Sequence, residues 1–416
     1  MTFKVKTKGQ NEGEKLLVPK LRFKGFKDEW KEISLKKIFT FFSTNSLSRA
    51  DLTADGLIKN IHYGDIHQKF NNILDVEKEK LPYINPNIEL SIKDNLCQNG
   101  DLIFADASED YEGIGKAIEI INIGNNKVVS GLHTIHARDI ESTMSIGFKG
   151  YLFNTPIIHN QIRILANGFK VFGISKNDIC NLNVRIPNKM EQEKIANLLS
   201  LLDKKIELQK RRIEALKIYK KGLLSKLYYT KNGEKTKISD ILEEVVDKST
   251  VNNQYNVISS TKENLVLQRE YFNKKIASEN NIGYKILKKY QIVFSPQNLW
   301  MGNINYNEKY NIGIVSPSYK VFNIKAGYDK NYIANLLKIP RAIYYYMINS
   351  EQGASIVRRN LNMETFYEIS FNIPSINEQI KIGNIIRKIY LKIENEEMCL
   401  KQLERLKKGL LQKMFI

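Results

Sequence analysis

The sequence predicts an α+β protein in which two similar globular domains are joined by two long antiparallel helices that form a coiled coil. Three observations lead to this fold class. The chain has 416 residues, which is too long for one ordinary hydrophobic core. A stretch of 42 residues occurs twice, and both copies have the periodicity of a long amphipathic helix. The segments before the two copies contain β-branched and aromatic runs that are typical of strands.

The repeat can be aligned without a gap, at an offset of 187 residues. The pattern Pro-x3-Glu-Gln-x-Lys-Ile at 187–195 returns at 374–382, and Lys-Lys-Gly-Leu-Leu-x-Lys at 220–226 returns at 407–413. Across the aligned stretch, 16 of the 42 residues are identical. Chance does not produce such agreement at a fixed offset, so the chain is an internal duplication with a pseudo-two-fold repeat.

Apolar residues recur with a period of 3.5 along each copy of the repeat. In the first copy, eight of ten seam positions are apolar; the positions are 195, 199, 202, 206, 209, 213, 216, 220, 223 and 227. The ten corresponding positions of the second copy are also apolar in eight cases. Polar residues interrupt both seams at the same places, which are Gln209 and Lys220 in one and Glu396 and Lys407 in the other. A sustained 3.5-residue period is typical of a coiled coil.

The direction of pairing follows from the order of the segments along the chain. The first helix carries the chain from the first domain to the second, and the second helix leaves the second domain, so antiparallel pairing would relate the two domains by a pseudo-two-fold axis. Packing of each helix against its own domain is the alternative. The predicted division is an N-terminal tail, a first domain, a central helix, a second domain and a distal helix, with bounds 1–20, 21–186, 187–230, 231–373 and 374–416.

The two domains resemble each other more weakly than the two helices do. Three pairs of segments correspond in order: 100–104 with 290–294 as buried strands, 128–130 with 314–316, and a turn at 168–170 with one at 353–355. One fold with diverged surfaces is what two binding modules of different specificity would show. Simple drift after an old duplication would look much the same.

The charge of the chain points to an anionic partner. Sixty-four Lys and Arg against 45 Asp and Glu leave a net charge of +19, while 42% hydrophobic residues are sufficient for folding. Nucleic acid is therefore the first candidate, and a membrane surface is the weaker one. Three widely spaced cysteines do not form a disulfide framework, and no apolar run resembles a signal peptide or a membrane span. We therefore expect a cytoplasmic protein.

The assembled motifs resemble those of the specificity (S) subunit of type I restriction-modification enzymes. The segment 18–30, which ends in Phe-Lys-Asp-Glu-Trp30, is similar to that family's approach to its first target-recognition domain. Ile-Pro followed by Glu-Gln at 186–192 and again at 373–379 resembles the starts of its central and distal conserved helices. The similarity covers nearly the whole chain. The departures are small: Gly383 replaces Ala196, and Tyr390 replaces Asp203.

The resemblance implies a non-catalytic reader of double-stranded DNA. In that family each recognition domain reads one half of a bipartite target, and the two helices set the spacing and dock methyltransferase (M) subunits. Restriction (R) subunits join the same complex. No cofactor is then expected on this chain, whereas S-adenosylmethionine, ATP and Mg are expected in the partner subunits.

Polar residues in loops are the candidates for DNA contact, because loops on a rigid scaffold carry function. Phosphate contacts position such proteins, and Arg suits guanine whereas Asn and Gln suit adenine. We predict contacts from Lys116 and Lys170 in the first domain. In the second domain we predict Gln297, Asn298, Arg358, Arg359 and Asn360. For each of these residues, an ordinary solvated position is the competing interpretation.

The Glu-Gln pairs at the helix starts are the candidates for docking a partner subunit. They are Glu191 and Gln192 in the first copy and Glu378 and Gln379 in the second. Plain helix capping would explain the same residues, since acidic and acceptor groups are favoured in a first helical turn.

No motif in the sequence indicates catalysis by this chain. The only Asn-Pro pair, at 85–86, lacks the Pro-Tyr of a base-amine methyltransferase loop, and Gly113-Ile-Gly115-Lys116 is too short for a phosphate-binding loop. His133 and His136 could hold a metal only with further ligands, so core or surface histidines are the better interpretation. Scattered acidic and lysine residues near 77–80 are weak support for a nuclease site.

Two other interpretations use the same architecture. A protein-binding adaptor with a coiled-coil strut would explain the two helices, but it leaves the charge of +19 unexplained. A silent or alternate specificity gene product would have the same sequence features as an active subunit.

Overall fold

The computed structural model describes residues 3–5, 17–89, 96–168, 171–229, 233–271, 280–352 and 359–416. The chain divides into two compact units: unit 1 comprises residues 1–210 and 399–416, and unit 2 comprises residues 211–398. Both units mix helices and strands, which confirms the predicted α+β class. Within the described part of the chain, no helix combines the length and the apolar character needed to span a bilayer.

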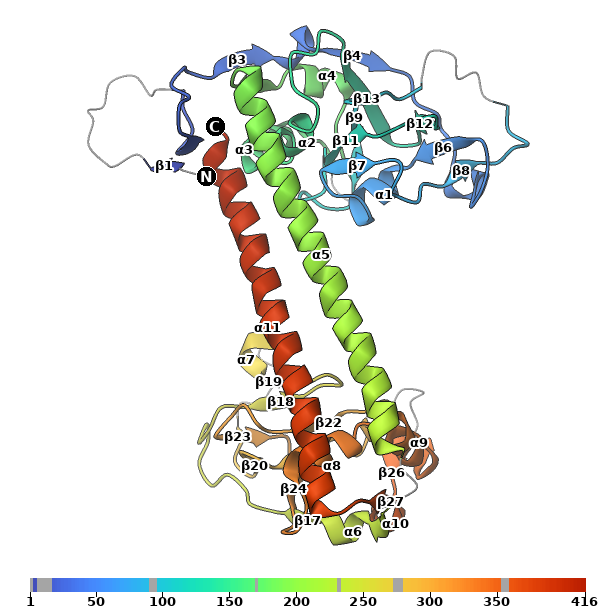
Figure 1. Ribbon diagram of the computed structural model, residues 1–416, viewed down its shortest axis with the longest axis vertical. Helices are drawn as coiled ribbons and strands as arrows, with labels where there is room; N and C mark the ends of the chain where they lie inside the picture. The colour runs from blue at the N-terminus through green and yellow to red at the C-terminus, as the bar shows by residue number, and fades with distance from the viewer. Residues whose placement is uncertain are drawn as a thin grey trace. The chain divides into compact units, whose positions relative to one another are not determined.

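Unit 1 is built around a five-stranded sheet in the order β4-β13-β9-β11-β7 (Figure 1). Its strands are β4 (Phe39–Phe42), β13 (Thr134–Asp139), β9 (Leu102–Ala105), β11 (Ala117–Ile121) and β7 (Ile73–Asp75). Neighbouring strands are antiparallel except for β11 and β7, which are parallel. The central strand β9 is fully buried, as its apolar run predicts.

A second sheet of unit 1 has the order β12-β6-β8-β5, with β12 and β6 parallel. Its strands are β12 (Lys127–Ser130), β6 (Ile58–Ile61), β8 (Tyr83–Ile84) and β5 (Leu52–Thr53). Two-stranded pairs add β1 (Phe3–Val5) with β2 (Leu21–Phe23), β3 (Lys31–Ser34) with β15 (Asn183–Ile186), and β10 (Ala107–Ser108) with β14 (Phe172–Gly173). The short helices are η1 (Leu35–Lys37), η2 (Arg49–Asp51), α1 (Tyr63–Gln68), α2 (Lys149–Leu152), α3 (Pro156–Leu165) and α4 (Lys176–Cys180).

The sheet of unit 2 repeats the strand order of unit 1. It runs β17-β24-β21-β22, all antiparallel, and matches β4-β13-β9-β11 strand for strand. The strands are β17 (Leu242–Val245), β24 (Lys320–Ile324), β21 (Ile292–Phe294) and β22 (Ile304–Tyr306). The predicted correspondence of 100–104 with 290–294 is therefore confirmed, since β9 and β21 hold equivalent positions. Both are completely buried.

The remaining elements of unit 2 are two-stranded pairs and short helices. Its strand pairs are β16 (Glu234–Lys237) with β27 (Ser370–Ile373), β18 (Ile258–Ser260) with β19 (Leu265–Leu267), β20 (Lys285–Lys288) with β23 (Ile312–Val315), and β25 (Ser350–Gln352) with β26 (Arg359–Leu361). Its short helices are α6 (Ile238–Ile241), α7 (Gln268–Tyr271), η3 (Leu299–Met301), α8 (Lys330–Leu336), α9 (Pro340–Ile348) and α10 (Met363–Glu368). The last strand of each unit leads directly into a long helix; β15 pairs antiparallel with β3, and β27 pairs antiparallel with β16.

The two predicted long helices are α5 (Lys189–Tyr228) and α11 (Ile376–Met414). Each begins two residues after the proline of its repeat, where the missing N–H of proline costs no internal helical hydrogen bond. None of the twenty predicted seam positions is exposed. In unit 1 the seam of α5 packs with Leu403, Leu410 and Met414 of α11, and in unit 2 Ile382 and Ile386 share a core with the last turns of α5. The coiled-coil seam is therefore confirmed.

Ion pairs between α5 and α11 give the direction of pairing within each unit. The pairs are Asp203–Lys407 at 2.6 Å and Lys210–Glu404 at 3.2 Å in unit 1, and Arg212–Glu396 at 2.9 Å and Lys217–Glu397 at 2.8 Å in unit 2. In unit 1 the residue numbers fall along α11 from Lys407 to Glu404 as they rise along α5. In unit 2 they fall from Glu396, which pairs with Arg212, to Tyr390, whose ring lies 4.1 Å from the Lys220 ammonium. The helices are therefore antiparallel in both units, as predicted.

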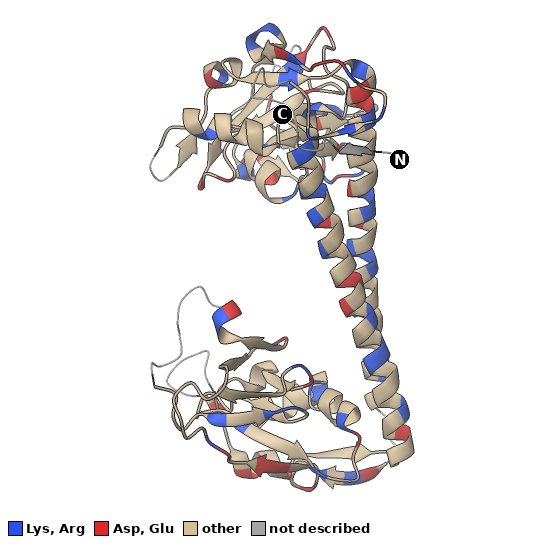
Figure 2. Ribbon diagram, turned by 90° about the vertical axis from the view of Figure 1, so that its left-hand side faces the viewer, with Lys and Arg blue, Asp and Glu red and all other residues tan. Residues whose placement is uncertain are grey.

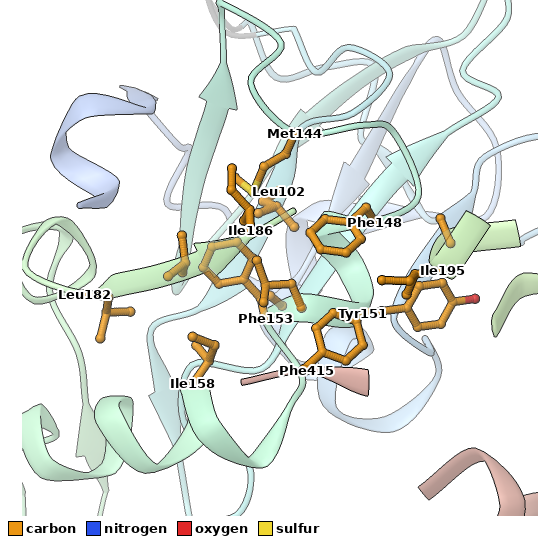
Figure 3. Close-up of a cluster of buried hydrophobic side chains, with 14 of the residues drawn as sticks. Leu102, Met144, Phe148, Tyr151, Phe153, Ile158, Leu182, Ile186, Ile195 and Phe415 are labelled. Atoms are coloured by element: carbon orange, nitrogen blue, oxygen red, sulfur yellow. The ribbon is translucent and has the colours of Figure 1, made fainter. Parts of the chain in front are cut away.

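An aromatic residue at the C-terminal end of each long helix anchors it in a core. Phe415 packs against Phe148 at 5.6 Å and edge-on against Trp30 at 6.2 Å, inside the main core of unit 1 (Figure 3). Tyr228 occupies the equivalent repeat position and stacks on Tyr332 at 4.8 Å in unit 2. Buried aromatic side chains contribute a few kcal/mol each, so these contacts fix the helix ends.

The departures between the two repeat copies have local causes. A Cβ at Gly383 would collide with the carboxylate of Asp329, the N-cap of α8, so only glycine permits this close approach. Tyr390 receives the Lys220 ammonium over its ring at 4.1 Å, where Asp203 in the other copy receives Lys407 as an ion pair. The first substitution therefore makes room for a neighbouring side chain, and the second preserves a contact in a different chemical form.

The compact units divide within the long helices rather than at their ends. Each helix contributes one part to unit 1 and the other to unit 2. The predicted tail also contributes structure, since β1 pairs with β2 in register Phe3↔Phe23.

Candidate nucleic-acid interface

In unit 2, the turn after the central strand β21 presents the two predicted amides. Gln297 and Asn298 are partly exposed, and the Asn298 N–H donates to the Ser295 carbonyl at 3.0 Å. The next residue, Leu299, is fully buried and begins η3, which closes on Gly302 at φ +87°. A buried anchor and a left-handed glycine therefore hold the two amides at the surface.

The hairpin β25–β26 brings Arg359 and Asn360 to the same place. The Arg359 N–H donates to the Gln297 carbonyl at 3.4 Å, and Asn360 is exposed opposite Glu351. Four of the five residues predicted in this domain thus lie on two touching segments, although 50 or more positions separate those segments in the sequence. The fifth, Arg358, lies outside the described residues.

The polar groups around Arg359 leave two donors without acceptors. Its Nη2 donates to the Ser350 carbonyl at 2.9 Å, and its guanidinium carbon lies 6.0 Å from the centre of the Trp300 ring. Arg359 Nε and Trp300 Nε1 are buried, and neither has a hydrogen-bond partner among the residues that the structure describes. Buried donors are normally paired, so a water molecule or another acceptor at this place would complete their hydrogen bonding.

The same contact between two segments recurs in unit 1. Here the turn after β9 begins at Asp106, whose carbonyl accepts from the N–H of Ile174 at 2.9 Å. Strands β10 and β14 extend this contact with the pairs Ala107↔Gly173 and Ser108↔Phe172. In both units, the turn after the central strand therefore meets the loop that follows the second short helix of the pair α2–α3 or α8–α9.

Aromatic and histidine side chains surround this turn in unit 1. Tyr111 lies 3.9 Å from Phe172, centre to centre, and is 47% exposed. His133 contacts the edge of Tyr63 at 5.2 Å, and its Nδ1 lies 3.2 Å from Asp106 Oδ1. Sequence reasoning missed Tyr111, Tyr63 and Phe172, because single aromatic residues in a turn or in very short elements give no periodic signal. Exposed aromatic rings can stack on bases or pack on sugars.

The structure gives Lys116 internal partners. Its Nζ donates to the carbonyls of Phe70 at 2.9 Å and His67 at 3.3 Å, so it closes the end of α1. Burial lowers the pKa of this ammonium group. Lys170 lies outside the described residues. The preceding Gly168 has φ +139°, and a side chain there would overlap the Val171 carbonyl, which explains the glycine in this turn.

The first predicted docking pair lies inside unit 1. Glu191 is completely buried, and both its oxygens accept from Arg22, at 2.7 Å each. Gln192 is 1% exposed; it donates to the Pro187 carbonyl at 2.9 Å and accepts from the Ser145 N–H at 2.7 Å. Both side chains fasten the start of α5 to its own unit.

The second pair shows which part of this arrangement is repeated. Gln379 donates to the Pro374 carbonyl at 2.9 Å and accepts from the Asp329 N–H at 3.0 Å, as Gln192 does in unit 1. Glu378 is exposed instead of buried. The shared Pro-x4-Gln spacing thus lets a glutamine clamp the proline carbonyl to the loop before α2 or α8.

A group of potential metal ligands in unit 1 includes His136 of strand β13. Cys97, Asp101 and His136 are buried, with ligand atoms within 4.8 Å of one another. The Asp101 carboxylate already accepts two bonds from Arg138 and one from His136 Nε2, all at 2.7 Å. Burial raises the pKa of the Cys97 thiol, which disfavours the thiolate that a metal would need. The Arg138 guanidinium already supplies the positive charge that a metal ion would bring to Asp101, so these residues form a structural network.

Basic residues are distributed over both units and along the long helices. Figure 2 shows Lys and Arg interleaved with Asp and Glu on α5 and α11, and further Lys and Arg on the globular parts. A cleft of about 670 Å³ beside the first turn of α5 is lined in part by Arg138, Lys149, Lys189 and Glu193. Several large apolar side chains on the helices are also exposed, among them Leu201, Leu208, Ile218, Leu391, Met398 and Leu406.

Comparison with known proteins adds a family and a fold. Residues 27–217 match the type I restriction modification DNA specificity domain. Over 96% of this chain and 99% of the other, the structure resembles the type I restriction-modification system S subunit from M. genitalium, with 14% identity and a TM-score of 0.58. A structure described as showing complex assembly and conformational transition of the type I R-M system matches over 97% and 99%, with 10% identity and a TM-score of 0.52. No curated protein matches the sequence.

Proposed function

We propose that the chain is a specificity subunit of a type I restriction-modification system and that it reads a bipartite DNA target through two separate surfaces, one in each unit. Such subunits recognise DNA and are not catalytic themselves. The observation that carries the proposal is the repeated contact between the turn after the central strand and the loop before α4 or α10. The same scaffold presents different side chains in the two units, so the two half-sites would differ in sequence.

In unit 2 we infer that Gln297, Asn298, Arg359 and Asn360 contact the DNA. Their position on two touching segments supports this assignment, and an acceptor on the DNA would complete the hydrogen bonding of Arg359 Nε and Trp300 Nε1, which have no partner within the described residues. Arg suits the O6 and N7 acceptors of guanine, and Asn and Gln suit adenine. Arg358 and Lys170 remain candidates from the sequence.

In unit 1 the corresponding surface includes Tyr111, Phe172 and His133. Aromatic and imidazole groups can contact sugars and unstacked bases, whereas Lys116 contributes by holding α1 in position. The two surfaces are therefore chemically distinct, as recognition of an asymmetric target requires.

The partners proposed for the chain are methyltransferase (M) and restriction (R) subunits. The exposed apolar side chains on α5 and α11 support protein docking along the helices, because scattered charge alone gives little affinity. Since Glu191, Gln192 and Gln379 are buried, the exposed Glu378 is the member of the predicted set that a partner could reach directly. S-adenosylmethionine, ATP and Mg would act in the partner subunits, and the complex would meet its DNA in the cytoplasm.

The decisive experiment is to co-express the chain with its M subunit and map methylated adenines across a genome. The wild type should methylate a split motif with a constant gap. Gln297→Ala with Arg359→Ala should relax or abolish specificity in one half of the motif and leave the other half unchanged. Tyr111→Ala should affect only the opposite half.

Lys235→Ala is the matched control, because Lys235 is exposed on β16 of the same unit and lies outside the two contacting segments. It should leave both halves of the motif intact. Methylation without a gapped motif would contradict the function. A gapped motif that the Gln297 and Arg359 variant leaves unchanged in both halves would remove those residues from the interface.

A further inference from the structure

Two ion pairs between the long helices are related by the internal repeat. Lys210 of α5 lies 3.2 Å from Glu404 of α11 in unit 1, and Lys217 lies 2.8 Å from Glu397 in unit 2. The offset of 187 residues makes Lys210 equivalent to Glu397 and Lys217 equivalent to Glu404. The pseudo-two-fold relation therefore exchanges the two pairs and reverses the sign of every charge in them.

This reversal has no counterpart in the apolar seam. Most seam positions carry apolar residues in both copies, and the polar interruptions fall at the same places. Apolar seams of such similar pattern would fit α5 against a second α5, or α11 against a second α11, nearly as well as they fit α5 against α11. Hydrophobic burial alone therefore does not select the correct partner helix.

The four charges supply that selection. In an antiparallel pair of two α5 helices with the same register, Lys210 would face Lys217 of the other chain. In a pair of two α11 helices, Glu397 would face Glu404. We propose that these four charged residues form a pairing code, which means that they decide which helices associate. They favour pairing of α5 with α11 and disfavour association of like helices from two copies of the chain.

The other contacts between the helices do not carry this code. Asp203 pairs with Lys407, but in a pair of two α5 helices it would face Lys220, which is equally basic. Lys220 lies over the ring of Tyr390, and Lys407 would meet that ring in a pair of two α11 helices. Arg212 pairs with Glu396, and in a pair of two α5 helices it would face Gln209, which removes an attraction without adding a repulsion. None of these contacts would become repulsive in a pair of like helices, so the repulsion comes from the two Lys–Glu pairs.

The charged groups are suitably placed for specificity rather than for stability. The side chains of both pairs are between 44% and 58% exposed, and ion pairs at such exposure contribute little to folding. In a dimer of like helices, however, four contacts would change from attraction to repulsion together. Charge pairs that flank an apolar seam choose partners in this way in other coiled coils.

The test compares three forms of the full-length chain after refolding at a series of concentrations. The first is the wild type. The second carries Lys210→Glu with Glu404→Lys, which keeps both opposite-charge pairs within the chain. It also makes positions 210 and 217 opposite in charge, and likewise 397 and 404, so like helices would attract instead of repel each other. The third carries all four exchanges, Lys210→Glu, Lys217→Glu, Glu397→Lys and Glu404→Lys, which reverses the code without removing it.

The dimer fraction is measured by light scattering after size exclusion, and thermal unfolding confirms that all three monomers are equally stable. The second form should give about tenfold more dimer than the wild type at equal concentration, the combined effect of four weak charge contacts. The third form should behave like the wild type. Equal dimer fractions in all three, or dimerisation of the third form as strong as that of the second, would overturn the proposal. Exchange of α11 between chains would contribute equally to every form, so it does not affect the comparison.

Discussion

The buried ion pair between Arg22 and Glu191 gives a quantitative test of how unit 1 is held together. The Glu191 side chain is 0% exposed and that of Arg22 is 10% exposed, with two parallel bonds of 2.7 Å between them. Replacing Arg22 with Leu leaves a carboxylate in the core without a counter-charge. Breaking a buried pair in this way costs about 3–5 kcal/mol, because the remaining charge has lost its hydration.

The assay uses the distribution of tryptophan in the chain. Of the two tryptophans, Trp30 is 1% exposed in unit 1 and Trp300 lies in unit 2. In a Trp300→Phe background, the emission of Trp30 during urea unfolding therefore follows unit 1 alone. Arg22→Leu should lower the free energy of unfolding measured by this transition by about 3 kcal/mol.

Two further variants separate burial of charge from simple loss of a contact. Arg185→Leu breaks an exposed pair with Glu32 in the same unit and should cost less than about 1 kcal/mol. Arg22→Leu combined with Glu191→Leu removes both charges and should recover more than half of the loss. A single-variant cost no larger than that of Arg185→Leu, or a double variant as unstable as the single, would refute the reasoning.

Two more predictions concern packing and pH. Phe415→Ala should cost unit 1 about 3–4 kcal/mol by the Trp30 transition, because Phe415 is 2% exposed, while the unit 2 transition, followed by Trp300 in a Trp30→Phe background, should not move. Burial lowers the pKa of Lys338 to about 8, so the folded state releases a proton before the unfolded state does and stability rises with pH. Relative to Lys338→Met, the wild type should gain about 2 kcal/mol between pH 8 and pH 10 in chemical unfolding, and parallel pH profiles of the two proteins would contradict this assignment.

The long helices are the part of the molecule that could be predicted best. Their apolar periodicity lies within one continuous stretch of sequence, so a helix can be predicted from that stretch alone. The duplication shows the same periodicity a second time. Their antiparallel direction followed from chain order. The equivalence of the two sheets was also visible, because buried strands such as β9 and β21 have continuous apolar runs.

The proposed interface was predicted only in part. Gln297, Asn298, Arg359 and Asn360 were chosen as separate loop residues, and their meeting at one surface depends on the contact between the Arg359 N–H and the Gln297 carbonyl. In unit 1 the sequence favoured lysines, whereas the structure places Tyr111 and Phe172 at the corresponding contact. Loops lack periodic patterns, so their side chains can be ranked by chemistry but not placed.

By itself the sequence determined that this protein is a duplication with two long paired helices and an excess of positive charge, since composition and periodicity are properties of the chain. Only the tertiary structure decided which polar groups are free to act. Glu191 and Glu378 have the same place in the repeat, yet one is sealed against Arg22, 169 positions away, and the other is exposed. The physical reason is that burial depends on which distant residues fold over a side chain, and no local pattern records that neighbour.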